Sequence, residues 1–221
     1  MNSNAKQSLK CNIFELVLFA ILGAMTFALK VAMMGLPNIE PVSLMVMLFA
    51  VIFGKKAIYP TYIYILLEFM LYGLNLWSIN YLYIWAVLLL LAWFMRESRS
   101  PLSWALLSGG YGLAFGALCT PVYMIVGGLK YGIAWWISGI PFDFLHGAGN
   151  FVIALVLFMP LRNAMEHIYN AFLSSFTGAK KATGNVSLNE NAEEIISGSG
   201  VESKDGDVFS DEVSVMRDSK Q

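Results

Sequence analysis

The chain has 221 residues, of which 57% are hydrophobic and 13% are charged, and its formal net charge is −1. A soluble domain carries about 25% charged residues. The near-zero net charge provides no basic surface for nucleic acid, and the apolar residues form long runs between Ile13 and Met159. The composition therefore predicts an all-α membrane protein that crosses the bilayer several times.

Six apolar runs predict a bundle of six transmembrane helices, at residues 13–34, 42–53, 57–74, 81–95, 102–126 and 141–159. At 1.5 Å per residue the second run is about 18 Å long, which is shorter than the ~30 Å hydrocarbon core. It therefore either begins earlier, around Leu36, or forms a shallow hairpin with the third run, with Lys55 and Lys56 at the tip.

The regions outside these runs are polar or amphipathic. Residues 1–12 form the N-terminus, and residues 13–162 form the transmembrane domain. Apolar residues at helical spacing predict an interfacial amphipathic helix at 163–177. The polar, acidic stretch 178–221 has the composition of a disordered tail.

The basic residues are unevenly divided between the two sides of the predicted bundle. Lysine and arginine gather on the cytoplasmic side of membrane proteins. One side has Lys130, with Lys30 if it reaches that surface, and the other has Lys6, Lys10, Lys55, Lys56, Arg96, Arg99 and Arg162. Both termini are therefore expected in the cytoplasm.

Three polar residues share one face of the last predicted helix. Asp143, His146 and Asn150 follow an i, i+3, i+7 spacing, which places them within an arc of about 60°. Polar groups at this depth are costly unless they face protein or water, so this face should point into the bundle. These side chains could contact a ligand, or they could bond to neighbouring helices and hold the bundle together.

Known catalytic motifs are missing from the sequence. There is no G-x-x-x-x-G-K-[ST] loop for a nucleotide and no H-E-x-x-H zinc motif, so we expect no catalytic residues, metal or cofactor. An integral membrane enzyme that uses His146 and Asp143 is an alternative hypothesis.

Lys30 and Glu68 form a second candidate group. Both lie near the outer ends of their predicted helices, where they could meet and neutralise each other. Lys30 could instead extend to the membrane surface. As coupling charges, the two residues would suit a self-sufficient secondary transporter or channel.

The outer loops 36–41, 75–80 and 127–141 combine Gly and Pro with amides and aromatic rings. Aromatic faces with a few fixed polar groups suit a pocket for a small planar ligand. The alternative for the aromatic residues is a belt at the membrane interface. The candidate substrate-binding residues in and beside these loops are Asn38, Glu40, Trp77, Asn80, Tyr81, Trp85, Tyr123, Trp135 and Trp136.

The first predicted helix carries an alanine at every fourth position, namely Ala20, Ala24, Ala28 and Ala32. Small residues at this spacing let another helix approach closely in lipid. The partner is either another helix of the same bundle or a helix of another protein. Within the bundle, Gly112 and Gly116 predict a similar close contact for the fifth helix.

With these features, residues 13–162 resemble the substrate-binding S components of energy-coupling factor (ECF) transporters, which are bacterial importers of vitamins. The resemblance rests on six spans with cytoplasmic termini and on the A-x-x-x-A repeat of the first span. It rests also on LPNIEPVSLMVMLFAVIFGKKA at 36–57 and IPFDFLHGAGNF at 140–151.

The resemblance implies a protein of the bacterial plasma membrane that is not itself an enzyme. It would capture a vitamin or a related heterocyclic small molecule near the outer face, with Asp143, His146 and Asn150 among the binding residues. Ala20, Ala24 and Ala28 would dock on a transmembrane coupling subunit, which works with two ATPase subunits. This division of labour fits the lack of a nucleotide motif in the chain.

Overall fold

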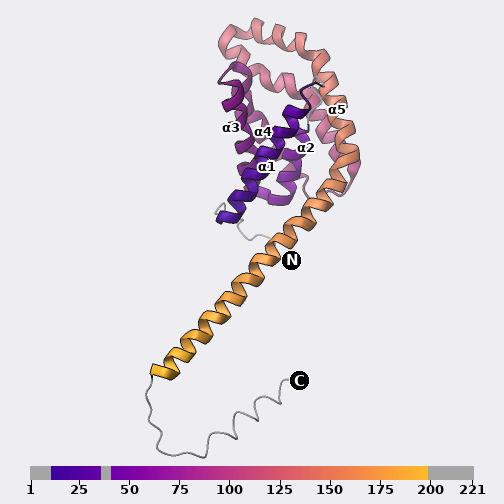
Figure 1. Ribbon diagram of the computed structural model, residues 1–221. Coiled ribbons are helices and arrows are strands. Elements are labelled where there is room, and N and C mark those ends of the chain that lie inside the picture. Colours follow the sequence, from indigo (N-terminus) through magenta and orange to yellow (C-terminus); the bar gives the residue numbers. More distant parts are fainter. Residues whose placement is uncertain (1–10, 36–40, 199–221) are drawn as a thin grey trace, which may run out of the picture. The chain divides into compact units, whose positions relative to one another are not determined.

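The computed structural model describes residues 11–35 and 41–198, and the side chains as far as residue 174. These residues form helices and no strand. The candidate site residues Asn38 and Glu40 lie outside the described residues. The elements, shown in Figure 1, are α1 (Ile13–Ala32), α2 (Val42–Phe53), a 3-10 turn η1 (Gly54–Ala57), α3 (Ile58–Tyr72), α4 (Leu76–Phe94) and α5 (Pro101–Gly198).

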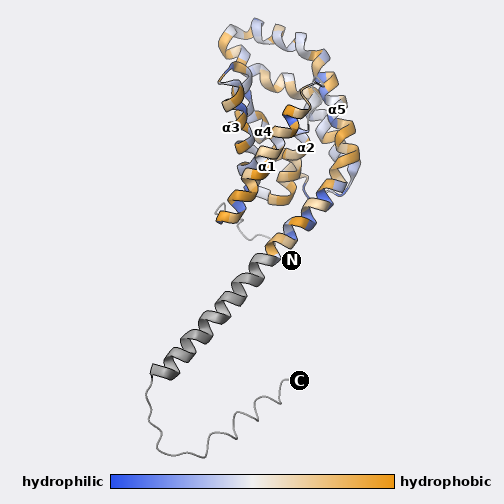
Figure 2. Cartoon of the chain, in the orientation of Figure 1, coloured by the Kyte–Doolittle hydropathy of each residue, from blue (hydrophilic) through white to orange (hydrophobic). Residues whose placement is uncertain are grey.

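Within the described part of the chain, four helical stretches are long and apolar enough to cross a membrane. They are Ile13–Ala32, Val42–Tyr72, Leu76–Phe94 and Pro101–Ser174. Apolar colouring dominates these helices in Figure 2. The second predicted helix has the bounds of α2, whereas the fifth and sixth predicted helices both fall within α5.

The α1 helix begins where its first turn is capped by side chains. The N–H of Glu15 donates to Asn12 Oδ1 at 2.8 Å, and the N–H of Asn12 donates to Glu15 Oε2 at 3.2 Å. This reciprocal pair is a capping box, which satisfies main-chain donors that have no partner within the helix. The helix ends at Ala32, two residues before the predicted end.

A tight hairpin joins α2 to α3. Gly54, at φ +57°, ends α2 in a conformation that favours glycine, and η1 then leads into α3. Two ion pairs show that α3 runs parallel to α1, because Lys56 meets Glu15 at 2.8 Å and Lys30 meets Glu68 at 2.6 Å.

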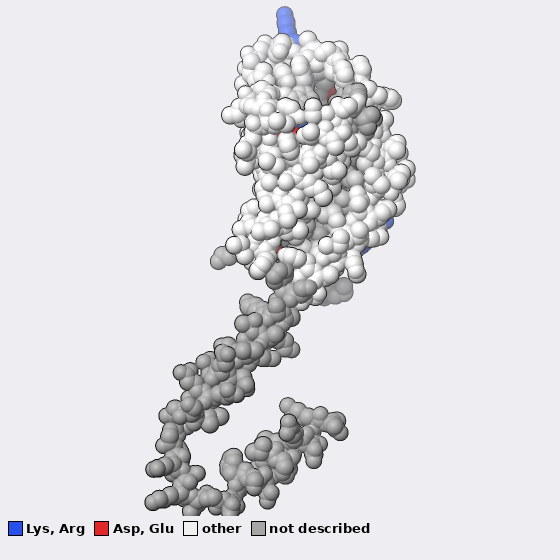
Figure 3. Space-filling view, viewed as in Figure 1, with Lys and Arg blue, Asp and Glu red and all other residues white. Residues whose placement is uncertain are grey.

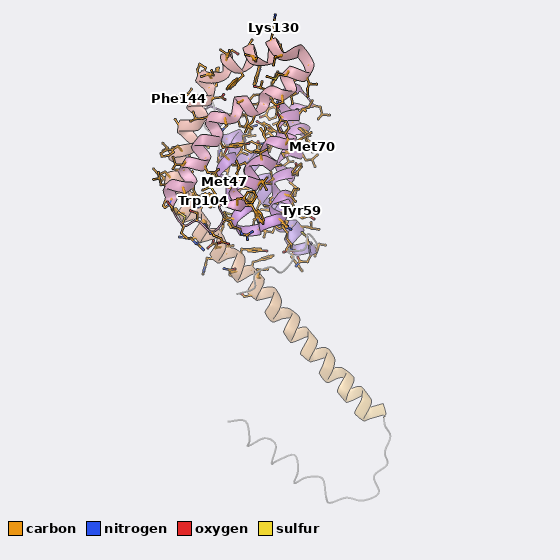
Figure 4. The ribbon with its side chains drawn as sticks, turned by 180° about the vertical axis from the view of Figure 1, so that it is seen from behind. Met47, Tyr59, Met70, Trp104, Lys130 and Phe144 are labelled. Carbon is orange, nitrogen blue, oxygen red and sulfur yellow. The ribbon has the colours of Figure 1, made fainter. Side chains whose placement is uncertain are left out.

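The α2 helix lies inside the bundle instead of forming a shallow hairpin at its surface. Ten of its twelve residues are buried, including Met47, which Figure 4 shows between the two ends of the bundle. A helix that is apolar on all sides is suited to such a position. The interior location explains why a run too short to span lipid squarely is still helical.

The α4 helix begins five residues earlier than predicted. Asn75 and Ser78 form a second capping box, in which each side chain accepts a hydrogen bond from the main-chain N–H of the other, at 2.9 and 3.0 Å. Trp77 and Asn80, which were predicted in or beside a loop, are therefore in the first turns of a helix.

The α5 helix turns back on itself at Gly128, whose φ of +83° and ψ of 170° are not helical. We refer to residues 101–127 as the first arm and to residues 141–169 as the second arm. The two arms run antiparallel, because Trp104 stacks on Phe158 at a centroid distance of 4.2 Å and Gly116 contacts Asp143 farther along. In Figure 1 the ribbon crosses one end of the bundle between the arms.

Arg162 joins the base of the second arm to the connection before α5. Its guanidinium donates to the carbonyls of Ser98 at 2.6 Å and Arg96 at 2.9 Å, and it pairs with Glu166 at 2.8 Å. The side chain is 4% exposed. Three acceptors around one buried cation satisfy its charge and fix this end of the bundle.

Beyond Tyr169 the chain forms a second unit, Asn170–Gln221. Its described part is helix as far as Gly198. The prediction of a disordered tail at 178–221 stays a prediction. The predicted interfacial segment 163–177 is also continuous helix.

Gly112 sets how closely the two arms of α5 approach each other. A Cβ at this position would lie 2.8 Å from the Cα of Gly147, closer than real Cβ atoms come to a backbone. Gly112→Leu should therefore lower the free energy of unfolding by about 1–3 kcal/mol or more. A thermal melt of the detergent-purified protein, followed by tryptophan fluorescence, measures the change.

The matched control is Gly110→Leu, because a Cβ at exposed Gly110 of the same arm meets nothing within 4 Å. Equal melting temperatures for the two variants would contradict the close contact.

Candidate ligand-binding site

A cavity of about 250 Å³ lies where the two arms of α5 meet the start of α4. This is the Lys130 end of the bundle in Figure 4, opposite the end that contains Trp104 and Tyr59. Figure 3 shows a hollow near the same end, with an acidic side-chain atom visible inside it. The cavity is lined by Trp77, Gly116, Trp135, Ser138, Gly139, Phe142, Asp143 and His146.

Asp143 is buried, with 7% of its surface exposed. Its Oδ1 accepts a hydrogen bond from the main-chain N–H of Gly116 at 2.9 Å. Its Oδ2 is also buried and has no hydrogen-bond partner within the described residues. One oxygen is thus used to hold the two arms together, and the other has no hydrogen bond although the residue lines the cavity.

His146 lies one helical turn after Asp143 and is 4% exposed. Its ring packs against Phe115 with the centroids 4.8 Å apart. Its Nε2 is buried, and the described part of the chain provides no partner for it. An imidazole nitrogen can donate or accept a hydrogen bond, so His146 adds a second unsatisfied polar group to the cavity wall.

Asn150 is buried as its spacing predicts, and so are Asp143 and His146. Its side-chain amide donates to Ser43 Oγ of α2 at 3.0 Å. It does not line the cavity. Of the two predicted roles, Asn150 therefore has the one that joins neighbouring helices.

Aromatic rings connect the cavity to the interior of the bundle. Trp77 packs against Trp135 and Phe115 at centroid distances of 6.3 and 5.9 Å. Trp135 stacks on Tyr123 at 3.8 Å, which holds the wall between the arms in place. Trp85 is fully buried and packs against Phe115 at a centroid distance of 6.0 Å.

Lys30 and Glu68 meet in a buried ion pair, as their positions predict. The Lys30 Nζ lies 2.6 Å from Glu68 Oε2, and the two side chains are 15% and 4% exposed. The ammonium group also lies over the rings of Tyr72 and Tyr81, 5.4 and 5.2 Å from their centroids. Lys30 therefore does not extend to the surface, because its charge is neutralised inside the bundle.

Tyr81 links this ion pair to the cavity. Its hydroxyl lies 3.5 Å from Lys30 Nζ and accepts a hydrogen bond from Trp77 Nε1 at 3.0 Å. Trp77 in turn lines the cavity. The ion pair thus positions a cavity wall through Tyr81 without lining the cavity itself.

Six of the described residues that were candidates for substrate binding do not line the cavity, namely Asn80, Tyr81, Trp85, Tyr123, Trp136 and Asn150. Trp136 is 38% exposed and does not line the cavity. Asn80 is buried, but its amide nitrogen donates to the Leu76 carbonyl and its Oδ1 accepts from the Tyr83 hydroxyl, both at 2.8 Å. These bonds are typical of a side chain that stabilises α4.

The sequence does not indicate several residues of the cavity wall. Phe142 precedes Asp143 of the polar face. Gly116 belongs to the G-x-x-x-G pair, which predicts a helix contact rather than a ligand site. Phe115 lies between Gly112 and Gly116. Once the two arms are known to pack through these glycines, its position beside the second arm follows. No group of three potential metal ligands occurs within the described residues.

The alanine stripe of α1, which we define as Ala20, Ala24 and Ala28, is exposed. Gly23 of the same helix is instead buried, and a Cβ there would lie 2.7 Å from Ile63 Cγ2 of α3. The contact of α1 within the bundle is thus made by Gly23 and its neighbours. The stripe is not covered by another helix within the described part of the chain.

Comparisons of the sequence with models of known protein families, with curated proteins and with solved structures find no match.

Removing one charge of the Lys30–Glu68 pair should destabilise the protein more than removing both. Loss of one partner of a fully buried pair costs about 3–5 kcal/mol, and partial exposure of Lys30 reduces this. We expect Glu68→Gln to lower the melting temperature clearly, and Lys30→Met/Glu68→Met to recover much of the loss. Thermal melts of the purified variants provide the measurement.

Glu97→Gln is the control for this cycle, because Glu97 is an exposed acid between α4 and α5. A double variant that is no more stable than Glu68→Gln alone would argue against an uncompensated lysine as the cause.

Proposed function

We propose that the chain is the membrane-embedded substrate-capture subunit of an ECF-type importer. In this proposal six segments cross the bilayer, namely α1, α2, α3, α4 and the two arms of α5. The cavity takes up a vitamin or a related small molecule at the extracellular side. The alanine stripe then docks on a transmembrane coupling subunit that is driven by two ATPase subunits.

The distribution of small residues carries the proposal. Gly23, Gly112 and Gly147 are used in close contacts within the bundle, whereas Ala20, Ala24 and Ala28 face outward. In lipid, small residues give an advantage only when another helix packs closely against them. An exposed stripe on a membrane helix therefore favours a second membrane protein as its partner.

The cavity supports capture of a small molecule. It combines aromatic walls with two buried polar atoms, Asp143 Oδ2 and His146 Nε2, that have no partner within the described residues. Leaving buried polar atoms unsatisfied is costly, so a ligand that bonds to them gains affinity.

The positions of the charges favour an extracellular cavity. Lys56, Arg96 and Arg162 lie at the end of the bundle opposite Lys130, and the cavity is at the Lys130 end. The end with the larger number of basic residues is expected to face the cytoplasm. The termini are then cytoplasmic, and the cavity is open to molecules outside the cell.

A self-sufficient secondary transporter is the second candidate function. Such a protein needs charges that can couple an ion to the substrate, and Lys30 with Glu68 is a buried pair near the cavity. In the structure the pair is neutralised internally and joined to Tyr81, which favours a structural role. Uptake that continues undiminished when the ATPase subunits are deleted would favour this candidate over the first.

Ala24→Leu should separate docking from capture. The larger side chain projects from the exposed stripe and prevents close helix approach, but it is remote from the cavity. We expect tagged protein from its own cells to lose its co-purifying ATPase subunits while retaining its small molecule. Native mass spectrometry of the eluate measures both.

Ala148→Leu is the matched control, because Ala148 is an exposed alanine of the second arm and lies outside the stripe. It should retain the ATPase subunits. Unchanged co-purification with Ala24→Leu would overturn docking through the stripe.

A further inference from the structure

We infer that the cavity selects a small planar organic cation. This inference rests on the proposed function, since it takes the cavity as the capture site and specifies the charge and size of the captured molecule. It is carried by the buried carboxylate of Asp143 and by the aromatic walls around it.

The charge balance of the described residues leaves one acid uncompensated. Three acidic residues are buried: Glu15, Glu68 and Asp143. Glu15 pairs with Lys56 at 2.8 Å and Glu68 with Lys30 at 2.6 Å. No ion pair is formed by Asp143 within the described part of the chain.

The surroundings of Asp143 provide hydrogen bonding but no positive charge. Its Oδ1 accepts from the Gly116 N–H, and its Oδ2 is buried without a hydrogen-bond partner among the described residues. The residue itself lines the cavity. Among the described residues, no lysine or arginine lines the cavity. A buried carboxylate is costly without an opposite charge, so the missing charge is best supplied by the ligand.

The walls of the cavity fit the same kind of molecule. Trp77, Trp135 and Phe142 present aromatic rings, which attract cations and pack well against planar groups. A volume of about 250 Å³ is below the usual 300–1,000 Å³ range for ligand sites and suits a molecule of about one ring with short substituents.

His146 completes the recognition of such a molecule. His146 lines the same cavity one helical turn after Asp143, and its Nε2 is buried without a partner among the described residues. It can bond to a second polar group of the ligand while the Asp143 carboxylate binds the charged N–H. The two residues together orient a planar molecule between the rings.

Three probes of the same shape and different charge test the inference on the unmodified full-length protein. They are benzamidinium (+1), benzamide (neutral) and benzoate (−1). Binding to detergent-purified protein is followed by the change in tryptophan fluorescence, since Trp77 and Trp135 line the cavity. We expect benzamidinium to bind about tenfold or more tightly than benzamide, and benzoate to bind more weakly than either.

Asp143→Asn connects this preference to the carboxylate. We expect the variant to bind benzamidinium no more tightly than benzamide. Glu166→Gln is the control, because Glu166 is an acid of the second arm outside the cavity, paired with Arg162. It should keep the preference of the unmodified protein.

Several outcomes would overturn the inference. Equal affinity for the three probes, tighter binding of benzoate, or no binding of benzamidinium would each do so, and none of them needs a folded variant. A cation preference that survives Asp143→Asn in a protein with an unchanged melting temperature would also do so. None of these results bears on co-purification of the ATPase subunits, whose loss or retention tests the proposed function separately.

Discussion

The hydrogen bond from the Gly116 N–H to Asp143 Oδ1 depends on a close glycine contact between the two arms of α5. Gly112 and Gly116 of the first arm leave no space for a Cβ, because the backbone of the second arm and the Asp143 carboxyl group occupy it. In a membrane, helices associate through packing rather than through the hydrophobic effect, so this contact determines how the arms align. The alignment in turn fixes Asp143 and His146 at the wall of the cavity.

The same contact explains why only half of the Asp143 carboxyl group is satisfied. Most main-chain N–H groups of a helix interior bond within the helix and are covered by side chains, and the first arm offers the N–H of Gly116 to Oδ1. The remaining oxygen is buried beside Gly116 and has no hydrogen-bond partner among the described residues. Elsewhere in the described bundle, buried acids are neutralised by lysines, as with Glu15 and Lys56. Among the described residues, Asp143 is therefore the buried acid that forms no ion pair.

The sequence predicts most of this arrangement where a local pattern decides it. Helical spacing correctly places Asp143, His146 and Asn150 on a buried face. The depth of Lys30 and Glu68 allows them to pair, as they do, but does not exclude extension of Lys30 to the surface. Residues whose role depends on a distant partner could not be predicted in this way. Asn150 is bonded to Ser43, 107 positions away, and Asn80 is used by its own helix.

The helix boundaries show the same limit. Apolar composition does not distinguish a capped helix start from a loop, so the sequence predicts a loop at Trp77, where the structure has a helix capped by Asn75 and Ser78. The predicted span at 42–53 has the correct bounds, but only the tertiary structure shows that it is an internal helix. Similarly, Gly128 ends the first arm through its positive φ, which the glycine-rich sequence permits but does not require.

Small residues occur in two different settings in this chain, in close contacts inside the bundle and on an exposed face of α1. Glycines such as Gly112 let backbones touch, and any side chain there would separate the helices permanently. The alanines of α1 keep a smooth, exposed surface beside larger apolar side chains such as Ile21 and Met25. Lipid tails cover such a surface at little cost, and a helix can replace them without any change in buried polar groups. A contact of this kind is suited to repeated association and release, whereas the glycine contact is suited to holding the cavity together throughout.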